Sequence, residues 1–472
     1  SGTVRVPVRM SAARAVYSSA RLRTAVAGEV LADGDVGHLE AGRVMMAAGR
    51  PSVVVRCTGA ADVVAALRYA EARDLPVAVR SGGHHAAGLG TNEGGVVIDV
   101  RPMNEVRLLP DDVVRVGTGA TWDEVAARLS RVGLAISSGD TATVGVGGLM
   151  AGGGIGWMVR KHGLAIDNVV SAEVVTADGS VRRVDAASAP ELFWGLRGAA
   201  GSLGVVTSYD ISAVRQPTVH YGSLLYPWTQ AEQVLAGWAA YAADAPDDLT
   251  SSFQLAPTMM ADRQVPVAVT VCVAGDADRR DAIIEPLRQL GSLLTDKVRE
   301  VPYAEVFADM AMPAEWRPKI RNGFFDAMTP ELTGPLLAAR PRIPGLAIEI
   351  RALGGTFGAM PADATAFAHR DARFLVNSVV MGSPEQQGSQ PEDFAELWRG
   401  LRPNGAYVNF LSDPTEADLD ACYPEPHRAR LAALKQAVDP GHVFRGPLSV
   451  PPRPEWAGGP RHLLRWAMRS RR

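Results

Sequence analysis

Two glycine-rich segments constrain the fold of this chain more than any other feature. The apolar run 75–79 is typical of a short strand, and it leads directly into RSGGH at 80–84. A strand that ends in consecutive glycines lets backbone N–H groups converge on an anion, because glycine has no side chain to block the approach. The second segment, 145–156, contains seven glycines and little side-chain bulk. Together the two segments predict the walls of a site for a large ligand that carries phosphate.

The first glycine pair is followed at once by a histidine, His84. Imidazole is a nucleophile, so this side chain would stand beside whatever the loop holds. Two low-bulk walls and one histidine favour a large, flat, phosphate-bearing cofactor. The candidate is a flavin that the histidine could hold covalently.

Composition narrows the class of protein. At 472 residues, a length of about 150 residues per domain predicts two or three domains. The net charge of −3 indicates neither nucleic acid nor an anionic membrane surface as a partner. The cysteines Cys57, Cys272 and Cys422 are far apart and odd in number, which predicts no disulfide framework and no metal site. No apolar run approaches the ~20 residues of a membrane helix, so we expect a cytoplasmic protein.

The order of elements changes near residue 215. Before it, apolar runs at 51–56, 75–79, 96–100 and 113–116 predict strands, and 61–73 and 122–132 predict helices. Segments 169–176 and 181–184, joined through ADGS, predict a hairpin. After it, strands are predicted at 265–273 and 346–353, and helices near 230–243, 277–290 and 391–401. This pattern indicates an α/β first part and a second, α+β domain.

Several further blocks, in the right order, resemble the covalent flavoprotein oxidases of the vanillyl-alcohol-oxidase and berberine-bridge-enzyme class. They are RSGGHH at 80–85, GGVVIDV at 94–100, TVGVGG at 143–148, RKHGL at 160–164, VVTADG at 174–179, LFWGLRG at 192–198, GVVT at 204–207 and YVNF at 407–410. The resemblance implies an α+β fold with a two-part FAD-binding domain of the PCMH type. Its parts would be 1–215 and 418–452, with a substrate-binding domain at 216–417 whose sheet roofs the flavin and a basic tail at 453–472.

The same resemblance assigns the cofactor site. It implies one covalent bond, from His84 to the 8α-methyl carbon of FAD, because Thr141 stands where many relatives carry a second attaching cysteine. A histidine that only caps the loop or binds phosphate is the alternative. The cofactor-binding residues it implies are Arg80, Ser81, Gly82, Gly83, His84, Thr141, Thr143, Val144, Gly145, Gly147, Gly148, Gly153, Gly154, Val206, Tyr407 and Asn409.

Tyr407 is the first candidate for a catalytic group, since the resemblance places it facing the substrate. A tyrosine with an ordinary pKa near 10 can take a substrate proton only if a nearby cation lowers that pKa. Arg321 and Arg351 are the candidates for this cation. Glu349 and Arg351 alternate on a predicted strand, which places both on one face, toward a cavity or on a solvated edge.

The remaining departures bear on the substrate. Ile155 and Phe410 stand where relatives often have aromatic or tyrosine side chains, which makes the substrate site less polar. Val144 is small enough to let O₂ reach the flavin, so O₂ is the expected acceptor. We therefore expect an FAD-dependent oxidase, monomeric or homodimeric, that oxidises a C–OH or C–N centre, or drives an oxidative cyclisation, in a small apolar natural-product intermediate. An oligosaccharide oxidase and a drug-resistance flavoprotein that binds or reoxidises a reactive metabolite are the alternatives.

Overall fold

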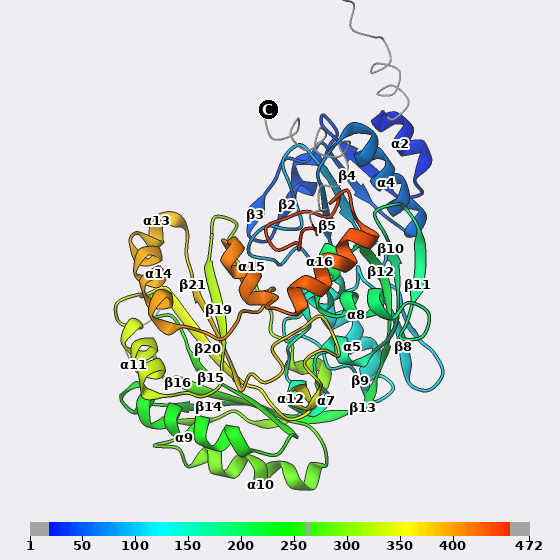
Figure 1. Cartoon of the computed structure of the whole chain (residues 1–472). Coiled ribbons are helices and arrows are strands. Elements are labelled where there is room, and N and C mark those ends of the chain that lie inside the picture. The colour runs from blue at the N-terminus through cyan, green and yellow to red at the C-terminus, as the bar shows by residue number, and fades with distance from the viewer. Residues whose placement is uncertain (1–17, 260–264, 454–472) are drawn as a thin grey trace, which may run out of the picture.

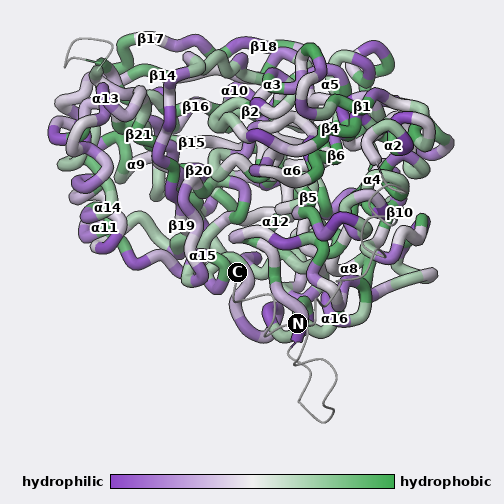
Figure 2. Tube along the Cα trace, turned by 90° about the horizontal axis from the view of Figure 1, so that it is seen from above, coloured by the Kyte–Doolittle hydropathy of each residue, from purple (hydrophilic) through white to green (hydrophobic). Residues whose placement is uncertain are grey.

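The computed structural model describes residues 18–259 and 265–453. The predicted basic tail, apart from Arg453, lies outside the described residues. The chain forms three principal sheets, and the strands of the largest lie on the opposite side of the molecule from those of the first (Figures 1 and 2).

The first sheet has four strands in the order β1 (Glu29–Ala32), β4 (Val53–Arg56), β6 (Val96–Asp99) and β5 (Val77–Arg80). The last three are parallel, and β1 is antiparallel to β4. Strands β4 and β6 are continuous valine-rich runs because both faces of a parallel sheet are covered. Helix α4 (Ala60–Arg73) packs its apolar side on this sheet. The glycine loop begins where β5 ends.

The second sheet has five antiparallel strands in the order β11 (Val181–Val184), β10 (Val169–Val175), β12 (Val205–Ser212), β8 (Val113–Gly117) and β7 (Val106–Leu108). The predicted hairpin is confirmed as β10 and β11. Three helices share the core beside this sheet: α5 (Trp122–Ser130), α6 (Val146–Gly152) and α8 (Pro190–Ala199). The second glycine-rich segment thus forms α6 and the turn after it.

The third sheet is antiparallel and has eight strands. Its main path runs β17 (Thr295–Asp296), β14 (Thr218–Tyr226), β16 (Val267–Val273), β15 (Leu249–Leu255), β20 (Leu346–Ala352), β21 (Phe374–Val380) and β19 (Lys319–Phe325), and β18 (Arg299–Pro302) pairs with β14.

Four helices cover one face of this third sheet and share a core with it (Figure 1): α9 (Ala231–Asp244), α10 (Ala277–Arg288), α11 (Pro330–Ala339) and α14 (Gln390–Leu401). Alternate residues of each strand enter that core, so the others point toward the rest of the molecule.

The chain then returns to its first part. Helices α15 (Glu416–Cys422) and α16 (His427–Val438) follow the third sheet, and α16 packs against α8. Phe444 enters the core of the first sheet. The α+β fold is confirmed. The second sheet's last strand ends at Ser212 and the third sheet begins at Thr218, while the domain boundaries themselves stay predictions. None of the described helices combines the length and the apolar character needed to span a bilayer.

Candidate active site

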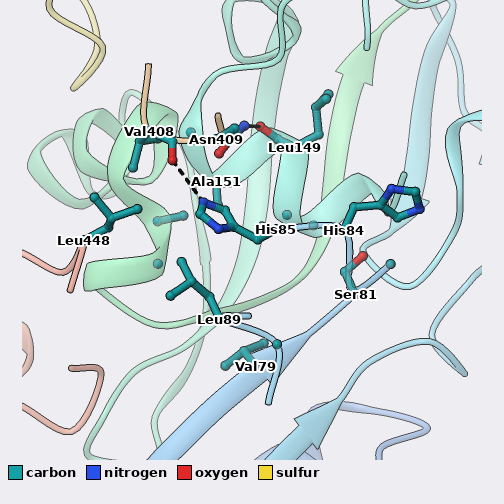
Figure 3. A pocket seen from close by; sticks show the side chains of 18 of the residues that line it. Val79, Ser81, His84, His85, Leu89, Leu149, Ala151, Val408, Asn409 and Leu448 are labelled. Atoms are coloured by element: carbon teal, nitrogen blue, oxygen red, sulfur yellow. Dashed lines mark hydrogen bonds between the residues drawn. The ribbon is translucent and has the colours of Figure 1, made fainter. Parts of the chain in front are cut away.

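A cavity of about 410 Å³ lies between the two glycine-rich segments, the closing segment 444–449 and the third sheet (Figure 3). Twelve of the sixteen predicted cofactor residues line it: Arg80, Ser81, Gly82, Gly83, His84, Thr141, Val144, Gly145, Gly147, Gly148, Val206 and Asn409. Thr143, Gly153, Gly154 and Tyr407 do not line it. They lie behind the wall, where they contact residues that do.

The first glycine loop provides a set of free amide donors. Gly83 has a φ of +71°, which turns the chain sharply after β5. Within the described part of the chain, the N–H groups of Gly82, Gly83 and His84 have no hydrogen-bond acceptor. Successive unpaired amides at a turn form a concave site for an anion. Their number and position suit the pyrophosphate of a dinucleotide cofactor.

The second glycine segment leaves room for the rest of that cofactor. A Cβ on Gly145 would lie 2.2 Å from the Gly82 nitrogen, so glycine lets the two segments touch. A Cβ on Gly148 would meet nothing within 4 Å, although Gly148 lines the cavity. The open space is therefore on the cavity side of α6. Free amides on one wall and open glycine surface on the other fit FAD.

The two adjacent histidines differ in what their ring nitrogens do. His85 Nδ1 accepts from the Ala87 N–H at 3.2 Å, so Nε2 carries the hydrogen and donates to the Val408 carbonyl at 3.0 Å. His84 Nε2 lies 2.9 Å from Thr143 Oγ1, and its Nδ1 has no partner among the described residues. The two rings point in different directions (Figure 3). Burial lowers the pKa of both, which favours the neutral imidazole. Only His84 keeps a ring nitrogen free.

Arg80 supports the loop from beneath. Its guanidinium donates to Asp99 Oδ2 at 2.7 Å and to the Ala41 carbonyl at 2.6 Å, and the side chain is almost fully buried. The charge is therefore engaged inside the first sheet, although part of the residue lines the cavity. Its contribution to cofactor binding is to fix the end of β5.

Tyr407 does not have the environment that the sequence predicted. Its hydroxyl accepts from the Gly154 N–H at 2.9 Å and from Asn409 Nδ2 at 2.8 Å. The side chain is 1% exposed, and this burial raises its pKa to about 12. The hypothesis of a cation that lowers this pKa is wrong. Tyr407 holds Asn409 and the turn after α6 in place.

Arg321 lies on the wrong face of the third sheet. Its neighbour Ile320 lines the cavity, and successive residues of a strand point to opposite faces. The Arg321 guanidinium instead donates to Asp418 of α15 at 2.6 Å. The prediction that it acts on Tyr407 is therefore wrong.

Arg351 lies on the cavity side, at the centre of a small ionic cluster. It donates to Asp140 Oδ2 at 2.5 Å and, through Nε, to Glu349 Oε1 at 3.0 Å. Its guanidinium also lies over the Trp157 ring, 4.3 Å from the centroid. Burial alone would lower the pKa of Arg351, but the charges of Glu349 and Asp140 outweigh it and raise that pKa. Two carboxylates around one guanidinium leave the cluster with a net negative charge.

This cluster stands where two cavities meet. Asp140 lines the first cavity, and Glu349 lines a second cavity of about 430 Å³ on the third sheet. Asn377 and Val379 line both. The second cavity is mostly apolar, and its lining residues are Leu225, Gln254, Leu255, Ala256, Val265, Pro266, Ala268, Ala347, Ile348, Glu349, Asn377 and Val379. It is suited to a small molecule with few polar groups.

Sequence reasoning missed several of these residues. The first cavity is also lined by Asp140, His85 and five residues of the closing segment: Phe444, Arg445, Gly446, Leu448 and Ser449. The part 418–452 was predicted to belong to the FAD-binding domain, but nothing in its composition indicated cavity contact. Asn377, together with Ser378, interrupts the apolar strand sequence FLVNSVV, and that interruption was the available signal.

The fold and the cavity together define an FAD-dependent oxidoreductase. Residues 51–185 match the FAD binding domain family. The chain is 31% identical to (R)-6-hydroxynicotine oxidase of Paenarthrobacter nicotinovorans over 424 residues, covering 85% of this chain and 92% of that protein. It belongs to the vanillyl-alcohol-oxidase (PCMH-type) and berberine-bridge-enzyme-like flavoproteins.

Solved structures agree with this membership. The crystal structure of 6-hydroxy-D-nicotine oxidase from Arthrobacter nicotinovorans is 27% identical, with a TM-score of 0.82, and the match covers 91% of this chain and 98% of that one. Xylooligosaccharide oxidase from Myceliophthora thermophila C1, solved with xylobiose, has the same TM-score of 0.82 at 24% identity, covering 92% and 98%. The second likeness shows the fold alone.

Proposed function

We propose that this protein is an oxidase that carries FAD on His84 and oxidises a C–OH or C–N centre of a small, largely apolar molecule, with O₂ as the electron acceptor. The observation that carries the proposal is the meeting of the two cavities at Asn377 and Val379, beside the ionic cluster. A substrate in the second cavity would there adjoin the cofactor cavity. FAD, when bound, supplies a two-electron acceptor for a hydride from the substrate carbon.

Glu349 is the group we assign to the substrate proton. Its carboxylate lines the second cavity and is held by Arg351, so it can accept the O–H or N–H proton while the carbon loses its hydride. The products are then a C=O or C=N bond, and both electrons pass to O₂ to give H₂O₂. The negative cluster supports substrates that present a hydrogen-bond donor or a positive charge. The relative named for the oxidation of 6-hydroxynicotine supports small-molecule chemistry of this kind.

Attachment through His84 has support from its surroundings. The ring is partly buried, its pKa is lowered, and Nδ1 is free, whereas both nitrogens of His85 are engaged. Thr141 lines the cavity but has no thiol, so we assign one bond only. Val144 lines the same cavity with a small side chain, which supports access for O₂.

Acid denaturation tests the attachment. Flavin should stay on the peptide that contains His84, as peptide mass will show, and a His84→Ala variant should release its flavin into the supernatant. Flavin that remains protein-bound in H84A, or is free in the wild type, would remove the covalent assignment.

An H₂O₂ assay over secondary amines, aromatic alcohols and oligosaccharides tests the reaction. With the best substrate, Glu349→Gln should lower the rate constant of flavin reduction by about 10²–10⁴, the usual range for a general base. Glu305→Gln, an exposed carboxylate on the same domain, is the matched control and should reduce at the wild-type rate. Equal rates in E349Q and wild type would exclude Glu349. A preference for oligosaccharides would favour the alternative of an oligosaccharide oxidase. Tight binding of a compound without turnover would favour the drug-resistance flavoprotein.

A further inference from the structure

A row of polar side chains crosses the cavity face of the third sheet. Strand register places Gln254 opposite Glu349, Glu349 opposite Asn377, and Asn377 opposite Asn322. The four residues therefore lie side by side on β15, β20, β21 and β19. Along the strands to either side of Asn377, the same face carries Leu375 and Val379.

Three members of this row have their hydrogen bonds made within the protein. The Gln254 amide donates to Ser252 Oγ at 3.0 Å and accepts from Thr270 Oγ1 at 3.2 Å. Glu349 accepts from Arg351. Asn322 Oδ1 accepts from the Tyr407 N–H at 2.6 Å. Its Nδ2 donates to the Tyr407 carbonyl at 2.9 Å and to the Phe410 carbonyl at 2.8 Å. The two amides and the carboxylate are thus held in place by hydrogen bonds to other groups of the protein.

Asn377 is the exception. Its Oδ1 is buried and has no hydrogen-bond partner among the described residues. Buried polar side-chain atoms nearly always have a partner, so a buried acceptor left unpaired requires an explanation. Asn377 also lines both cavities, next to Glu349 across the strand pair. The Asn377 side chain as a whole is only half-buried at this junction, where the reacting end of a substrate would lie, and rotation about χ2 would turn its amide oxygen toward that place.

We propose that Asn377 is a specificity-determining residue whose amide oxygen accepts a hydrogen bond from an O–H or N–H group of the substrate. This inference rests on the proposed function, and it names the feature that a substrate needs. A site that holds a polar group ready for a donor rejects the analogue that lacks the donor, because the site's own group is then left unpaired. The enzyme thus selects apolar molecules that carry a donor for Asn377 near the carbon to be oxidised, in addition to the O–H or N–H hydrogen that Glu349 takes.

The test is a binding measurement with a matched pair of probes. 2-Naphthol carries one O–H donor on an apolar two-ring body, and 2-methoxynaphthalene has the same body without the donor. Binding is followed by the change in flavin absorbance and by the rise in Tm of the oxidised holoenzyme, so neither readout needs turnover. Wild type should bind 2-naphthol about tenfold or more tighter than 2-methoxynaphthalene, as one buried hydrogen bond predicts.

Asn377→Leu keeps the branching at Cγ, with a somewhat larger side chain, and removes the acceptor. The preference for 2-naphthol should disappear, chiefly by loss of 2-naphthol affinity, and Tm without probe should stay level or rise because no protein hydrogen bond is lost. Asn404→Leu makes the same change at an exposed turn and should keep the wild-type preference.

Three results would overturn the inference: equal wild-type affinity for both probes or no binding of either, an equal loss of both probes in N377L, or a lower Tm in N377L with the preference intact. Any of these can occur while H₂O₂ production by wild type stands. Failure of the proposed function would instead appear as absence of turnover, with probe binding unaffected.

Discussion

Replacing Lys435 by methionine should destabilise the closing segment that borders the cofactor cavity. Lys435 and Asp439 are both fully buried, and Lys435 Nζ donates to Asp439 Oδ2 at 2.6 Å, to the Ser202 carbonyl at 2.6 Å and to the Phe444 carbonyl at 2.7 Å. K435M would leave one carboxylate without its counter-ion and the Ser202 carbonyl without this donor, while the Phe444 carbonyl would keep only the Ser449 hydroxyl. Breaking a buried pair from one side costs about 3–5 kcal/mol, which for a chain of this length corresponds to a fall in Tm of about 3–5 °C.

K435M should also affect the cofactor, because the two residues whose carbonyls Lys435 binds lie in the wall of the cofactor cavity. Ser202 and Phe444 both line the cofactor cavity, so the loosened segment should also expose the flavin to quenchers. Thermal unfolding followed by circular dichroism gives Tm, and iodide quenching of flavin fluorescence reports exposure. Lys297→Met, an exposed lysine, is the control and should match wild type. The double variant K435M/D439L should recover part of the loss, because it removes the stranded charge. A K435M protein with wild-type Tm would refute the reasoning.

Three further predictions follow from single contacts. Gly148→Ala should fold with the wild-type Tm, because a Cβ at this position meets no other atom. In the H84A background the same change should speed the release of FAD in a dilution assay, because the methyl group would project into the open side of α6. An unchanged release rate would mean that the cofactor does not approach α6. Tyr407→Phe should lower Tm by leaving the Gly154 N–H and one of the two Asn409 amide hydrogens without an acceptor, a loss of about 1–3 kcal/mol. The pH profile of kcat/KM should keep its shape, and a shifted alkaline limb would show that Tyr407 titrates in the reaction. His162→Gln should make Tm less sensitive to acid, since burial, aided by Lys161, lowers the pKa of His162 from 6.5 to about 4. The unfolded chain gains that proton first, so wild type loses stability as pH falls from 6.5 toward 4, and parallel Tm–pH curves for the two proteins would contradict this.

The cofactor site was predictable from the sequence because its chemistry is carried by the backbone. Consecutive glycines after an apolar run specify a turn with free amides, and the run that predicts β5 places them without further information. The environment of Tyr407 was not predictable in this way. Its pKa depends on burial and on Gly154 and Asn409, which only tertiary packing brings together.

The faces of the third sheet show a similar limit. The alternation of Glu349 and Arg351 correctly placed both on one face, but sequence alone could not say which face was the cavity. Arg321 was a candidate without any predicted strand around it, and on β19 it is Ile320 and Asn322 that occupy the inner side. A shift of one residue in the register of a strand moves all its side chains to the opposite face of the sheet.

That same alternation explains how the substrate site can vary without loss of the fold. On β21, Phe374, Val376 and Val380 enter the core under the helices, while Asn377 and Val379 line the cavities. On β20, Ile348 and Ile350 pack into that core, and Glu349 faces the other way. Substitutions at the cavity-facing positions therefore change the size and polarity of the substrate site while the packing that stabilises the sheet stays the same. The cofactor loops belong to other sheets, so specificity and cofactor binding can change independently, and Asn377 is a position where the two cavities are nonetheless coupled.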